Sequence, residues 1–386
     1  MIERQGSGPR LATPDDFPDI LDLVDRCFNH SSGGMASEWC HVYDREQPDR
    51  HAVITENGTV VSHVSIVEDE LVIGDGHLQS WGISGVATEP RTRGQGYMSD
   101  LMDFWMERMD SAGVPFGKLG GDRKRYGHWG WERAGRERRY RVTERFFERD
   151  QVPDDARIER YDGSAEHITQ LRDRYQRRNL RVRRDEEAWR NRLDRAQFTT
   201  LLRTDANEKG YLTFSRTRHN HRETTVSDLG GSPSTIRALL AHVFDTFGKQ
   251  TIHVDMHPTD QQNRLFSGPD VSGYWEDRPH RMVYVGDLSQ ILAAYRNSIA
   301  RRAAGANVPP GSISLEITED GDPVALEWDG RSITVRAADH ATVSVNRMAM
   351  ARLLFWDPNT VPAYDNQPLL AATLPLGFYV PLVDRV

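Results

Sequence analysis

Cysteine and lysine are scarce in this chain of 386 residues. The two cysteines, Cys27 and Cys40, are too few for a disulfide framework and lack the spacing of a metal-binding motif, so we expect both to be reduced thiols. Lysine occurs only at Lys118, Lys124, Lys209 and Lys249, and arginine supplies the rest of the positive charge. The sequence therefore implies no metal site and no disulfide-stabilised secreted fold.

Long apolar runs are also lacking. No stretch is long enough to cross a bilayer, and the first residues, MIERQGSGPRLATPDDF, hold no apolar segment typical of a secretory leader. We therefore expect a cytoplasmic protein that does not enter a membrane. A net charge of −8 argues against nucleic acid as the main partner, because binding to phosphates needs a cationic face, whereas a cationic amine substrate suits this charge.

The length exceeds what one compact core accommodates and predicts two or three domains. In the first segment, a helix near 17–28 precedes strands that we expect at 52–55, 60–67, 71–73 and 78–88. The second segment repeats this plan, with strands at 199–202, 211–215 and 224–229, a helix ending at Gly248, and a strand at 251–256. The third segment opens with a helix at 288–299, followed by strands at 313–317, 324–328 and 332–335 and a helix near 347–354.

The most informative stretch runs from Gly82 to Trp131. It combines an apolar strand, a loop rich in glycine and arginine, an amphipathic helix and a glycine-rich second strand. Apolar residues recur there with the spacing of one buried helix face, at Met98, Leu101, Met102, Trp105 and Met109. The loop ahead of this helix, 93–96, then lies where unpaired N–H groups and the helix dipole favour an anion, and its glycines let a diphosphate approach the backbone.

At these residues the chain resembles the GNAT superfamily of acyl-CoA-dependent N-acyltransferases, whose pyrophosphate loop reads Arg/Gln-x-x-Gly-x-Gly/Ala. Arg93 and Gly96 fall in that register, and Met98 stands where the family has a small residue. The resemblance implies that acetyl-CoA pairs with the backbone of the preceding strand at Val86, Ala87 and Thr88. It further implies contacts with the loop and the residues beyond it, namely Arg93, Gly94, Gln95, Gly96, Tyr97, Met98, Ser99 and Asp122.

The resemblance also implies catalytic roles. Tyr126 matches the family tyrosine that faces the thioester sulfur and protonates the leaving thiolate, although a buried core tyrosine is the alternative. In the Eis (enhanced intracellular survival) type of this superfamily the terminal carboxylate serves as the base, which here belongs to Val386. The family often ends in an aromatic residue, so Val386 departs from it. Phe28 and Trp39 lie in the region that lines the amine pocket, and core packing is the alternative for both.

The whole-chain pattern is similar to the Eis-type architecture, an α+β fold of tandem GNAT domains followed by a sterol carrier protein-like α+β domain. This implies a catalytic domain at 1–148, a degenerate second GNAT domain at 149–284 and a C-terminal domain at 285–386. The second loop, 230–234, lacks the arginine spacing, and Pro233 removes a backbone donor, so we expect no cofactor there. The family's ring-like hexamers imply a homo-oligomer.

The sequence thus predicts an N-acetyltransferase that moves an acetyl group from acetyl-CoA to an amine by direct attack in a ternary complex, without a metal. The acceptor stays open among aminoglycosides, polyamines and protein lysines. Two alternatives stay open as well. One is an acyltransferase that prefers a longer chain, as in the similar N-myristoyltransferases, and the other is a non-catalytic protein that binds acyl-CoA or lipid.

Overall fold

A computed structural model describes residues 6–146, 157–205, 208–215, 222–266, 274–364 and 367–385. The chain divides into two compact units. Unit 1 joins the residues up to Ala134 to Arg281–Leu376, and unit 2 joins Gly135–His280 to Gly377–Arg385. The three-domain division expected from the sequence stays a prediction, and each unit is described by itself.

Unit 1 is built on a mixed sheet with the strand order β1-β2-β3-β4-β5-β13. Neighbouring strands are antiparallel except β4 and β5, which are parallel. The strands are β1 (Arg10–Leu11), β2 (His51–Glu56), β3 (Thr59–Ile73), β4 (Gly76–Thr88), β5 (Phe116–Leu119) and β13 (Trp275–Val285), the last of which contributes Met282–Val285. Only β4 and β5 are joined by a crossover helix, which places their carboxyl ends at the same edge of the sheet.

The structure corrects one expectation, because the two strands predicted at 60–67 and 71–73 are a single strand, β3. Its register with β4 is unbroken from Val67 to Ile73. The acidic residues between them interrupt the apolar pattern and suggest a break, but Asp69 lies inside the sheet, where its Oδ2 accepts a hydrogen bond from Lys118 Nζ at 2.6 Å. Because the charge of Asp69 is paired with Lys118, the strand can continue through a position where the sequence pattern suggests a break.

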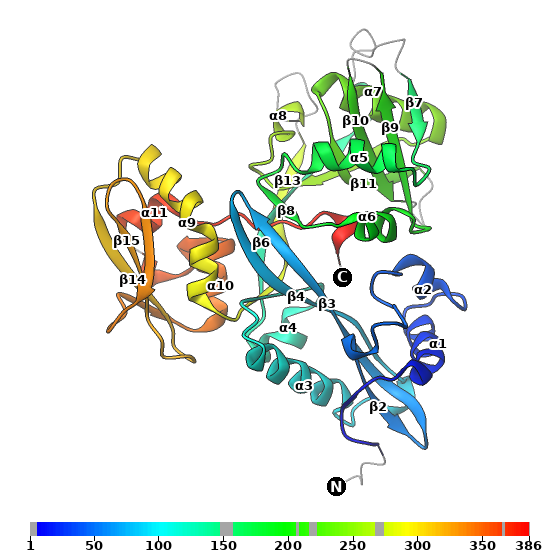
Figure 1. Ribbon diagram of the computed structural model, residues 1–386, viewed down its shortest axis with the longest axis horizontal. Coiled ribbons are helices and arrows are strands. Elements are labelled where there is room, and N and C mark those ends of the chain that lie inside the picture. Colours follow the sequence, from blue (N-terminus) through cyan, green and yellow to red (C-terminus); the bar gives the residue numbers. More distant parts are fainter. Residues whose placement is uncertain are drawn as a thin grey trace. The chain divides into compact units, whose positions relative to one another are not determined.

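Helices cover both faces of this sheet (Figure 1). Alternate strand residues enter different cores, since Ile54 belongs to the cluster that packs on α3 and Val53 to the cluster that packs on α1. The predicted apolar stripe of α3 is confirmed, with Leu101 and Trp105 almost fully buried. The helices and short turns of this part are α1 (Phe17–Cys27), α2 (Gly34–Glu38), α3 (Tyr97–Ser111), α4 (Arg123–Tyr126), η1 (Pro14–Asp16), η2 (Pro48–Arg50), η3 (Pro90–Thr92) and η4 (Gly127–Trp129).

The remainder of unit 1 forms a second sheet with the strand order β16-β15-β14-β17. Helix α9 contacts both β16 and β4, and the absence of a side chain at Gly76 allows the α9 backbone at Ala294 to lie against β4. The elements are α9 (Leu288–Gly305), β14 (Gly311–Ile317), β15 (Val324–Trp328), β16 (Ile333–Ala337), β17 (Val343–Val345), α10 (Arg347–Phe355), η7 (Pro358–Thr360), η8 (Pro362–Tyr364) and α11 (Pro368–Thr373).

Unit 2 repeats the plan of the first sheet, with the strand order β6-β12-β11-β10-β9-β7 (Figure 1). One core packs under α7, and a second core, around Trp189, involves α5 and α6. The strands are β6 (Glu132–Val142), β7 (Ile158–Arg160), β8 (Leu180–Val182), β9 (Phe198–Thr204), β10 (Lys209–Ser215), β11 (Glu223–Gly230) and β12 (Thr251–Met256). The helices are α5 (Ala165–Tyr175), α6 (Glu186–Leu193), α7 (Pro233–Phe247) and α8 (Asn263–Phe266), with η5 (Glu144–Phe146) and η9 (Leu382–Asp384).

The two sheets are related by an exchange of strands. In unit 2, β11 and β12 are parallel and joined by α7, just as β4 and β5 are joined by α3. The strand that pairs with β12 is β6, which follows the unit 1 elements in sequence, whereas β5 pairs with the end of β13, which follows the unit 2 elements. The sheet of unit 2 is therefore completed by β6, which follows the first elements of unit 1 in sequence, and the sheet of unit 1 by the end of β13, which follows the elements of unit 2.

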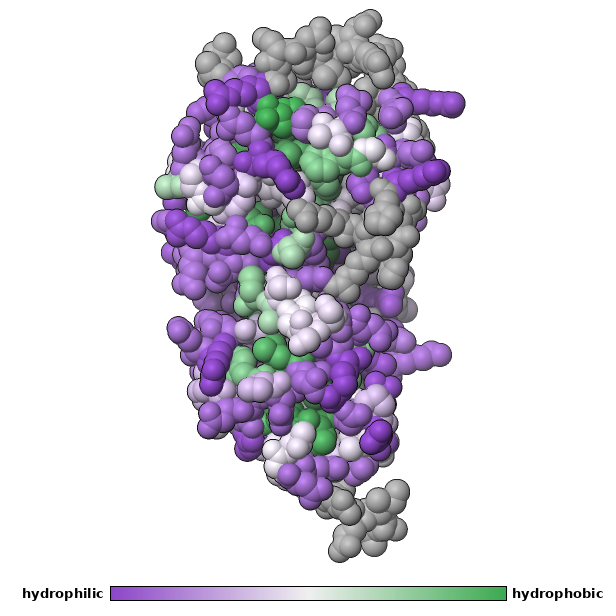
Figure 2. Space-filling model, turned by 90° about the vertical axis from the view of Figure 1, so that its right-hand side faces the viewer, coloured by the Kyte–Doolittle hydropathy of each residue, from purple (hydrophilic) through white to green (hydrophobic). Residues whose placement is uncertain are grey.

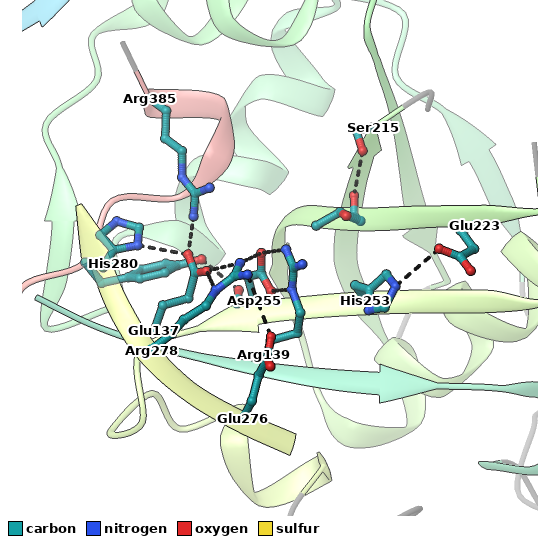
Figure 3. A network of polar contacts seen from close by, with 12 residues as sticks. Glu137, Arg139, Ser215, Glu223, His253, Asp255, Glu276, Arg278, His280 and Arg385 are labelled. Atoms are coloured by element: carbon teal, nitrogen blue, oxygen red, sulfur yellow. Dashed lines mark hydrogen bonds and ion pairs between the residues drawn. The ribbon is translucent and has the colours of Figure 1, made fainter. Parts of the chain in front are cut away.

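The C-terminal segment Gly377–Arg385 is anchored in unit 2 by buried ion pairs. The Asp384 carboxylate is fully buried and accepts hydrogen bonds from Arg184 and, at 3.1 Å, from the Tyr175 hydroxyl. Arg385 pairs with the buried Glu137, which also accepts a hydrogen bond from His280 Nδ1 at 2.9 Å (Figure 3). The hydrogen bond from His280 and the charge of Arg385 hold the pKa of Glu137 well below its usual range despite burial.

The molecular surface is mostly polar. The face in Figure 2 is largely hydrophilic, and its apolar residues form small separate groups. Large apolar side chains that stand exposed among the described residues are Phe28, Tyr274 and Trp275. In the same residues, no helix has both the length and the apolar character needed to span a bilayer.

Candidate functional site

The parallel strands β4 and β5 separate at their carboxyl ends. Their ladder runs from Ser80 and Phe116 to Ile83 and Leu119 and goes no further. Beyond Leu119 the chain turns at a pair of glycines toward α4, while β4 continues to Thr88. The edge of β4 from residue 84 to 88 is therefore not paired with β5, and an extended ligand can add to it as a strand would.

The predicted cofactor-binding positions Val86, Ala87 and Thr88 lie on this edge. Their side chains are already used within the fold. Val86 packs against the α3 core, Ala87 is buried in the α1 core, and the Thr88 hydroxyl lies 2.9 Å from the Ser62 hydroxyl. What this segment offers a ligand is therefore its main chain.

A β-bulge at Gly85 sets the direction of that main chain. The register between β3 and β4 shifts between His63 and Ser65, and Gly85 opposite has a φ of 57°, in the left-handed region that favours glycine. Its carbonyl oxygen lies 2.8 Å from His63 Nδ1. Because a carbonyl can only accept, the His63 ring must donate here, which fixes its tautomer.

A buried histidine pair supports the bulge and was not anticipated from the sequence. His51 Nδ1 lies 2.9 Å from His63 Nε2, and both side chains are inaccessible to solvent. Burial lowers the pKa of His51 to about 4 and that of His63 to about 3. The pair is therefore neutral near pH 7. With His63 Nδ1 donating to Gly85, His63 Nε2 accepts the hydrogen bond from His51 Nδ1. The sequence signal that was available is the isolated glycine within a strand, which is typical of a bulge.

A buried hydroxyl lies beside the same bulge. A Cβ atom placed on Gly85 would lie 2.7 Å from the Tyr43 hydroxyl and 3.1 Å from Ser65 Oγ, and neither oxygen has a hydrogen-bond partner among the residues that the structure describes. Burial raises the pKa of Tyr43 far above its ordinary value, so the phenol keeps its proton. The bulge is thus packed by polar groups that leave no room for a side chain at position 85.

The predicted diphosphate loop, Arg93–Gly96, has the backbone needed for close approach of an anion. Gly94 and Gly96 have φ values of 85° and 88°, and Gly96 is the N-cap of α3, a helix of 15 residues. A glycine cap has no side chain to cover the first N–H groups of the helix. Arg93 and Gly94 are exposed, and Arg93 Nε lies 3.3 Å from the Thr88 carbonyl oxygen. The loop therefore presents N–H groups and a guanidinium beside the end of β4.

Residues around the loop anchor it from within. Tyr97 is buried, and its hydroxyl donates to Glu56 Oε1 at 2.5 Å and lies 2.9 Å from Gln95 Oε1. Met98 is half-buried against the α3 core, whereas Ser99 is exposed. The Tyr97 and Met98 side chains thus hold the helix in place, which leaves their N–H groups at the helix start for an anion.

The predicted acid, Tyr126, is the last residue of the short helix α4. Asp122 caps this helix, because its Oδ1 accepts a hydrogen bond from Lys124 N at 3.0 Å. Tyr126 is only 3% exposed and packs in the α3 core. Burial raises its pKa, and the neighbouring Arg125 opposes the shift. The phenol therefore stays protonated near pH 7, as a proton donor must.

The two residues expected to line the amine pocket differ in exposure. Phe28 follows α1 and is 43% exposed, whereas Trp39 follows α2, is half-buried and packs against the α1 core. Asp25 shapes the connection between them, since its carboxylate accepts hydrogen bonds from the N–H groups of Gly33 at 2.6 Å and Met35 at 2.8 Å. An exposed aromatic ring on a fixed loop suits contact with a substrate.

Unit 1 therefore brings the β4 edge, the α3 loop and Tyr126 to one end of its sheet. The expected base, Val386, lies outside the described residues. A search of the described ranges gave no group of three or more histidine, cysteine, aspartate or glutamate side chains arranged to hold a metal ion. The geometry offers main-chain donors, a helix start whose N–H groups suit a phosphate, and a neutral phenol, a set suited to acyl transfer.

Comparison with known families identifies this region. Residues 9–134 match the family described as an acetyltransferase (GNAT) domain. This stretch contains the β4 edge, the α3 loop and Tyr126. This part of unit 1 therefore resembles a GNAT acetyltransferase domain, as the sequence analysis led us to expect. No curated protein matched the chain as a whole or in part.

Solved structures share the fold over nearly the whole chain. A GCN5-related N-acetyltransferase from Anabaena variabilis has a TM-score of 0.70 and 16% identity, and the match covers 99% of this chain and 100% of that one. Another, from Kribbella flavida, has a TM-score of 0.68 and 18% identity, with 99% of each chain covered. Eis1 from Mycobacterium abscessus has a TM-score of 0.64 and 14% identity, with 97% and 98% covered. At these identities the likeness shows the fold alone.

Proposed function

We propose that this protein is an N-acetyltransferase that moves an acetyl group from acetyl-CoA to an amine by direct attack in a ternary complex. The observation that carries the proposal is the joint placement, in one GNAT domain, of an open β4 edge and a glycine-rich loop at the start of α3. The first suits the pantetheine arm and the second the diphosphate.

The chemistry follows from these groups. The amine nitrogen attacks the thioester carbonyl carbon, a C–N bond forms, and the C–S bond breaks. Main-chain N–H groups of β4 stabilise the negative charge that develops on the carbonyl oxygen. Tyr126 gives its proton to the departing thiolate, whose ordinary pKa is near 8.5, and Arg125 beside it favours the phenolate that remains.

The base in this proposal is the terminal carboxylate of Val386, which accepts the proton that the amine loses. Asp384 and Arg385, the two residues before it, are held within unit 2 by ion pairs with Arg184 and Glu137. A carboxylate with a pKa near 3.5 is a weak base, so the role requires desolvation or a bridging water.

We further propose a cytoplasmic homo-oligomer, a hexamer by its resemblance to the Eis type, that uses acetyl-CoA as cosubstrate and no metal. The acceptor is an amine of the aminoglycoside, polyamine or lysine type, with Phe28 and Trp39 as walls of its pocket. Residues 285–386 are proposed as the sterol carrier protein-like domain.

The test is calorimetric titration with acetyl-CoA. In Gly96→Asp, added bulk and negative charge at the start of α3 should weaken acetyl-CoA binding at least a hundredfold. Gly113→Asp is a matched control, because Gly113 lies just past the end of the same helix and, like Gly96, has a positive φ, here 63°. If the Gly96→Asp protein folds and binds acetyl-CoA as tightly as the parent, the loop is not part of the site.

These observations are also partly compatible with two other functions. A longer-chain N-acyltransferase would use the same β4 edge, and a non-catalytic acyl-CoA or lipid-binding protein would need no proton donor. Thermal shifts with acetyl-CoA, palmitoyl-CoA and a sterol, measured separately, distinguish the three. Release of CoA in the presence of a panel of amines then identifies the acceptor class.

A further inference from the structure

Unit 2 contains a cavity of about 350 Å³ at the carboxyl ends of β11 and β12. Its walls come from the loop before α7, the segment after β12, the end of α5 and the start of β10. Open sheets bind ligands beyond the carboxyl ends of parallel strands, and this volume lies at the lower end of the range of small-molecule sites.

Some of the charged side chains around the cavity have a partner of opposite charge, and others do not. The acidic residues are occupied within the protein: Glu208 accepts hydrogen bonds from Ser232 and, at 2.7 Å, from Thr235 Oγ1, and Asp260 lies 3.9 Å from Arg178. Arg178 is itself held by Asp228, with Nη1 and Oδ1 2.6 Å apart. Asp228 and Asp260 are thus paired with Arg178, whereas Glu208 is held by hydroxyl groups and keeps its negative charge.

Three further cations line the cavity without an acidic partner. Arg174 Nε donates to the Lys209 carbonyl oxygen at 3.0 Å, and within the described residues neither Arg174, Arg177 nor Lys209 forms an ion pair. Arg177 and Lys209 are also exposed. Three cations at one opening favour a doubly charged anion, and the planar guanidinium groups match phosphate oxygens in pairs.

The start of α7 excludes a diphosphate of the kind that fits the loop before α3. Pro233 lacks an N–H group, and the Ser232 hydroxyl already accepts a hydrogen bond from Thr235 N at 3.2 Å. The Glu208 carboxylate contacts both hydroxyl side chains there, so a second anion would meet like charge. An anionic ligand must therefore place its charge at the cationic opening.

We propose that unit 2 binds a small organic phosphate, with its phosphate group on Arg174, Arg177 and Lys209. Other lining residues, including Gln261 and Gln262, offer hydrogen bonds to hydroxyl groups, and Leu229 and Tyr379 offer apolar contact. The cavity suits a ligand of about the size of a sugar phosphate or a nucleoside monophosphate. This site is separate from the proposed acetyl-CoA site and does not depend on the transferase activity.

The experiment is calorimetric titration of the full chain, saturated with CoA, using ribose 5-phosphate, uridine 5′-monophosphate and uridine. CoA fills the unit 1 site, so further binding reports on another one. We expect at least one of the two phosphates to bind with one equivalent per chain, and uridine, which lacks the phosphate, not to bind. If neither phosphate binds the CoA-saturated chain at millimolar concentration, the proposal is overturned.

Two variants locate the site. Arg177→Gln combined with Lys209→Gln removes two exposed cations and should weaken phosphate binding at least tenfold. Arg172→Gln changes an arginine on the same helix, α5, that does not line the cavity, and should leave binding unchanged. Melting temperatures establish that all proteins are folded. Equal affinity in the double variant and the parent would place the phosphate elsewhere and refute the assignment.

Discussion

The buried phenol of Tyr126 is the residue on which proton transfer to the leaving group depends in this proposal. Burial raises its pKa above the ordinary value of 10.0, which keeps it protonated but also makes it a weaker acid. A thiolate with a pKa near 8.5 takes this proton only with help from the site, and Arg125 is the cation in place to give it.

Tyr126→Phe removes the proton and keeps the ring. We expect turnover to fall on the order of a hundredfold, the usual effect of losing a positioned acid, with acetyl-CoA affinity within a few-fold of the parent. Steady-state rates of CoA release and calorimetric affinities check both points. The core should be preserved because the ring still fills it, which a melting temperature verifies. Unchanged turnover would assign Tyr126 to core packing alone.

The His51–His63 pair predicts a loss of stability in acid. The folded-state pKa values, about 4 and about 3, lie below the ordinary 6.5, so the unfolded chain binds these protons first. The stabilisation is therefore fully present above about pH 6.5 and decreases as the pH falls toward 4.

We expect His63→Gln, whose amide can still donate to Gly85, to flatten the fall in the free energy of unfolding between about pH 6.5 and 4. Urea titrations at several pH values measure the slope. His128→Gln, at an exposed histidine of the same unit, should keep the parent slope. A parallel slope in His63→Gln and the parent would show that the buried pair does not control acid stability.

From the sequence, roles can be proposed for single residues only where a motif carries them, and those proposed here stay predictions. Arg93, Gly96 and Tyr126 stand out because their types and spacing match a chemistry. His51 and His63 do not, because a histidine within an apolar strand gives no sign of its partner, and the two meet only through the pairing of β2 with β3.

Among the elements, the bulge in β4 directs the main chain that is proposed to bind the acyl group. Its geometry depends on glycine, because φ at Gly85 is 57° and the Tyr43 hydroxyl fills the space where a Cβ atom would lie. The neighbouring Gly94 also has a positive φ, 85°, but faces open space.

This difference gives a matched pair of substitutions. Gly85→Ala should lower the free energy of unfolding by about 3 kcal/mol, because strain and a steric clash add, whereas Gly94→Ala should cost about 1 kcal/mol from the backbone alone. Chemical denaturation measures both. Equal losses for the two variants would mean that the polar groups under the bulge adjust freely to an added methyl group.

Helix α3 was predictable to within two residues, because its apolar stripe and its glycine boundaries are local signals. The continuity of β3 was not, since a buried Asp69 becomes acceptable only when Lys118 arrives from β5. Long-range charge pairing leaves no local pattern, so a strand that contains it looks interrupted.

At the scale of the whole molecule, the C-terminal segment Gly377–Arg385 is part of unit 2. Asp384 and Arg385 are held by Arg184 and Glu137, so we expect residues added after Val386 to leave these ion pairs intact. Only the position of the terminal carboxylate would change.

Appending a few residues after Val386 should therefore preserve the melting temperature and acetyl-CoA affinity but lower turnover on the order of a hundredfold, the usual contribution of a positioned base. Val386→Phe keeps the carboxylate in place and should stay within several-fold of the parent. Turnover assays on the three proteins decide the point. Full activity of the extended chain would exclude the terminal carboxylate as the base.

The tandem plan was predictable from the repeated order of strands and a helix in the two halves. The exchange of β6 and β13 was not predictable. Nothing in the local sequence of either strand indicates which strand it will pair with. That choice is made by edge complementarity between segments far apart in the chain.

The exchanged strands also bear on how the chain is made. A ribosome synthesises β5 long before the end of β13, so the growing sheet of unit 1 keeps an open edge while all of Gly135–His280 is added. Unpaired strand edges attract other chains, so nascent molecules are exposed to misassociation until residue 285 has emerged. A polypeptide released before that point would keep the edge permanently, and we expect it to aggregate rather than to yield a smaller working enzyme.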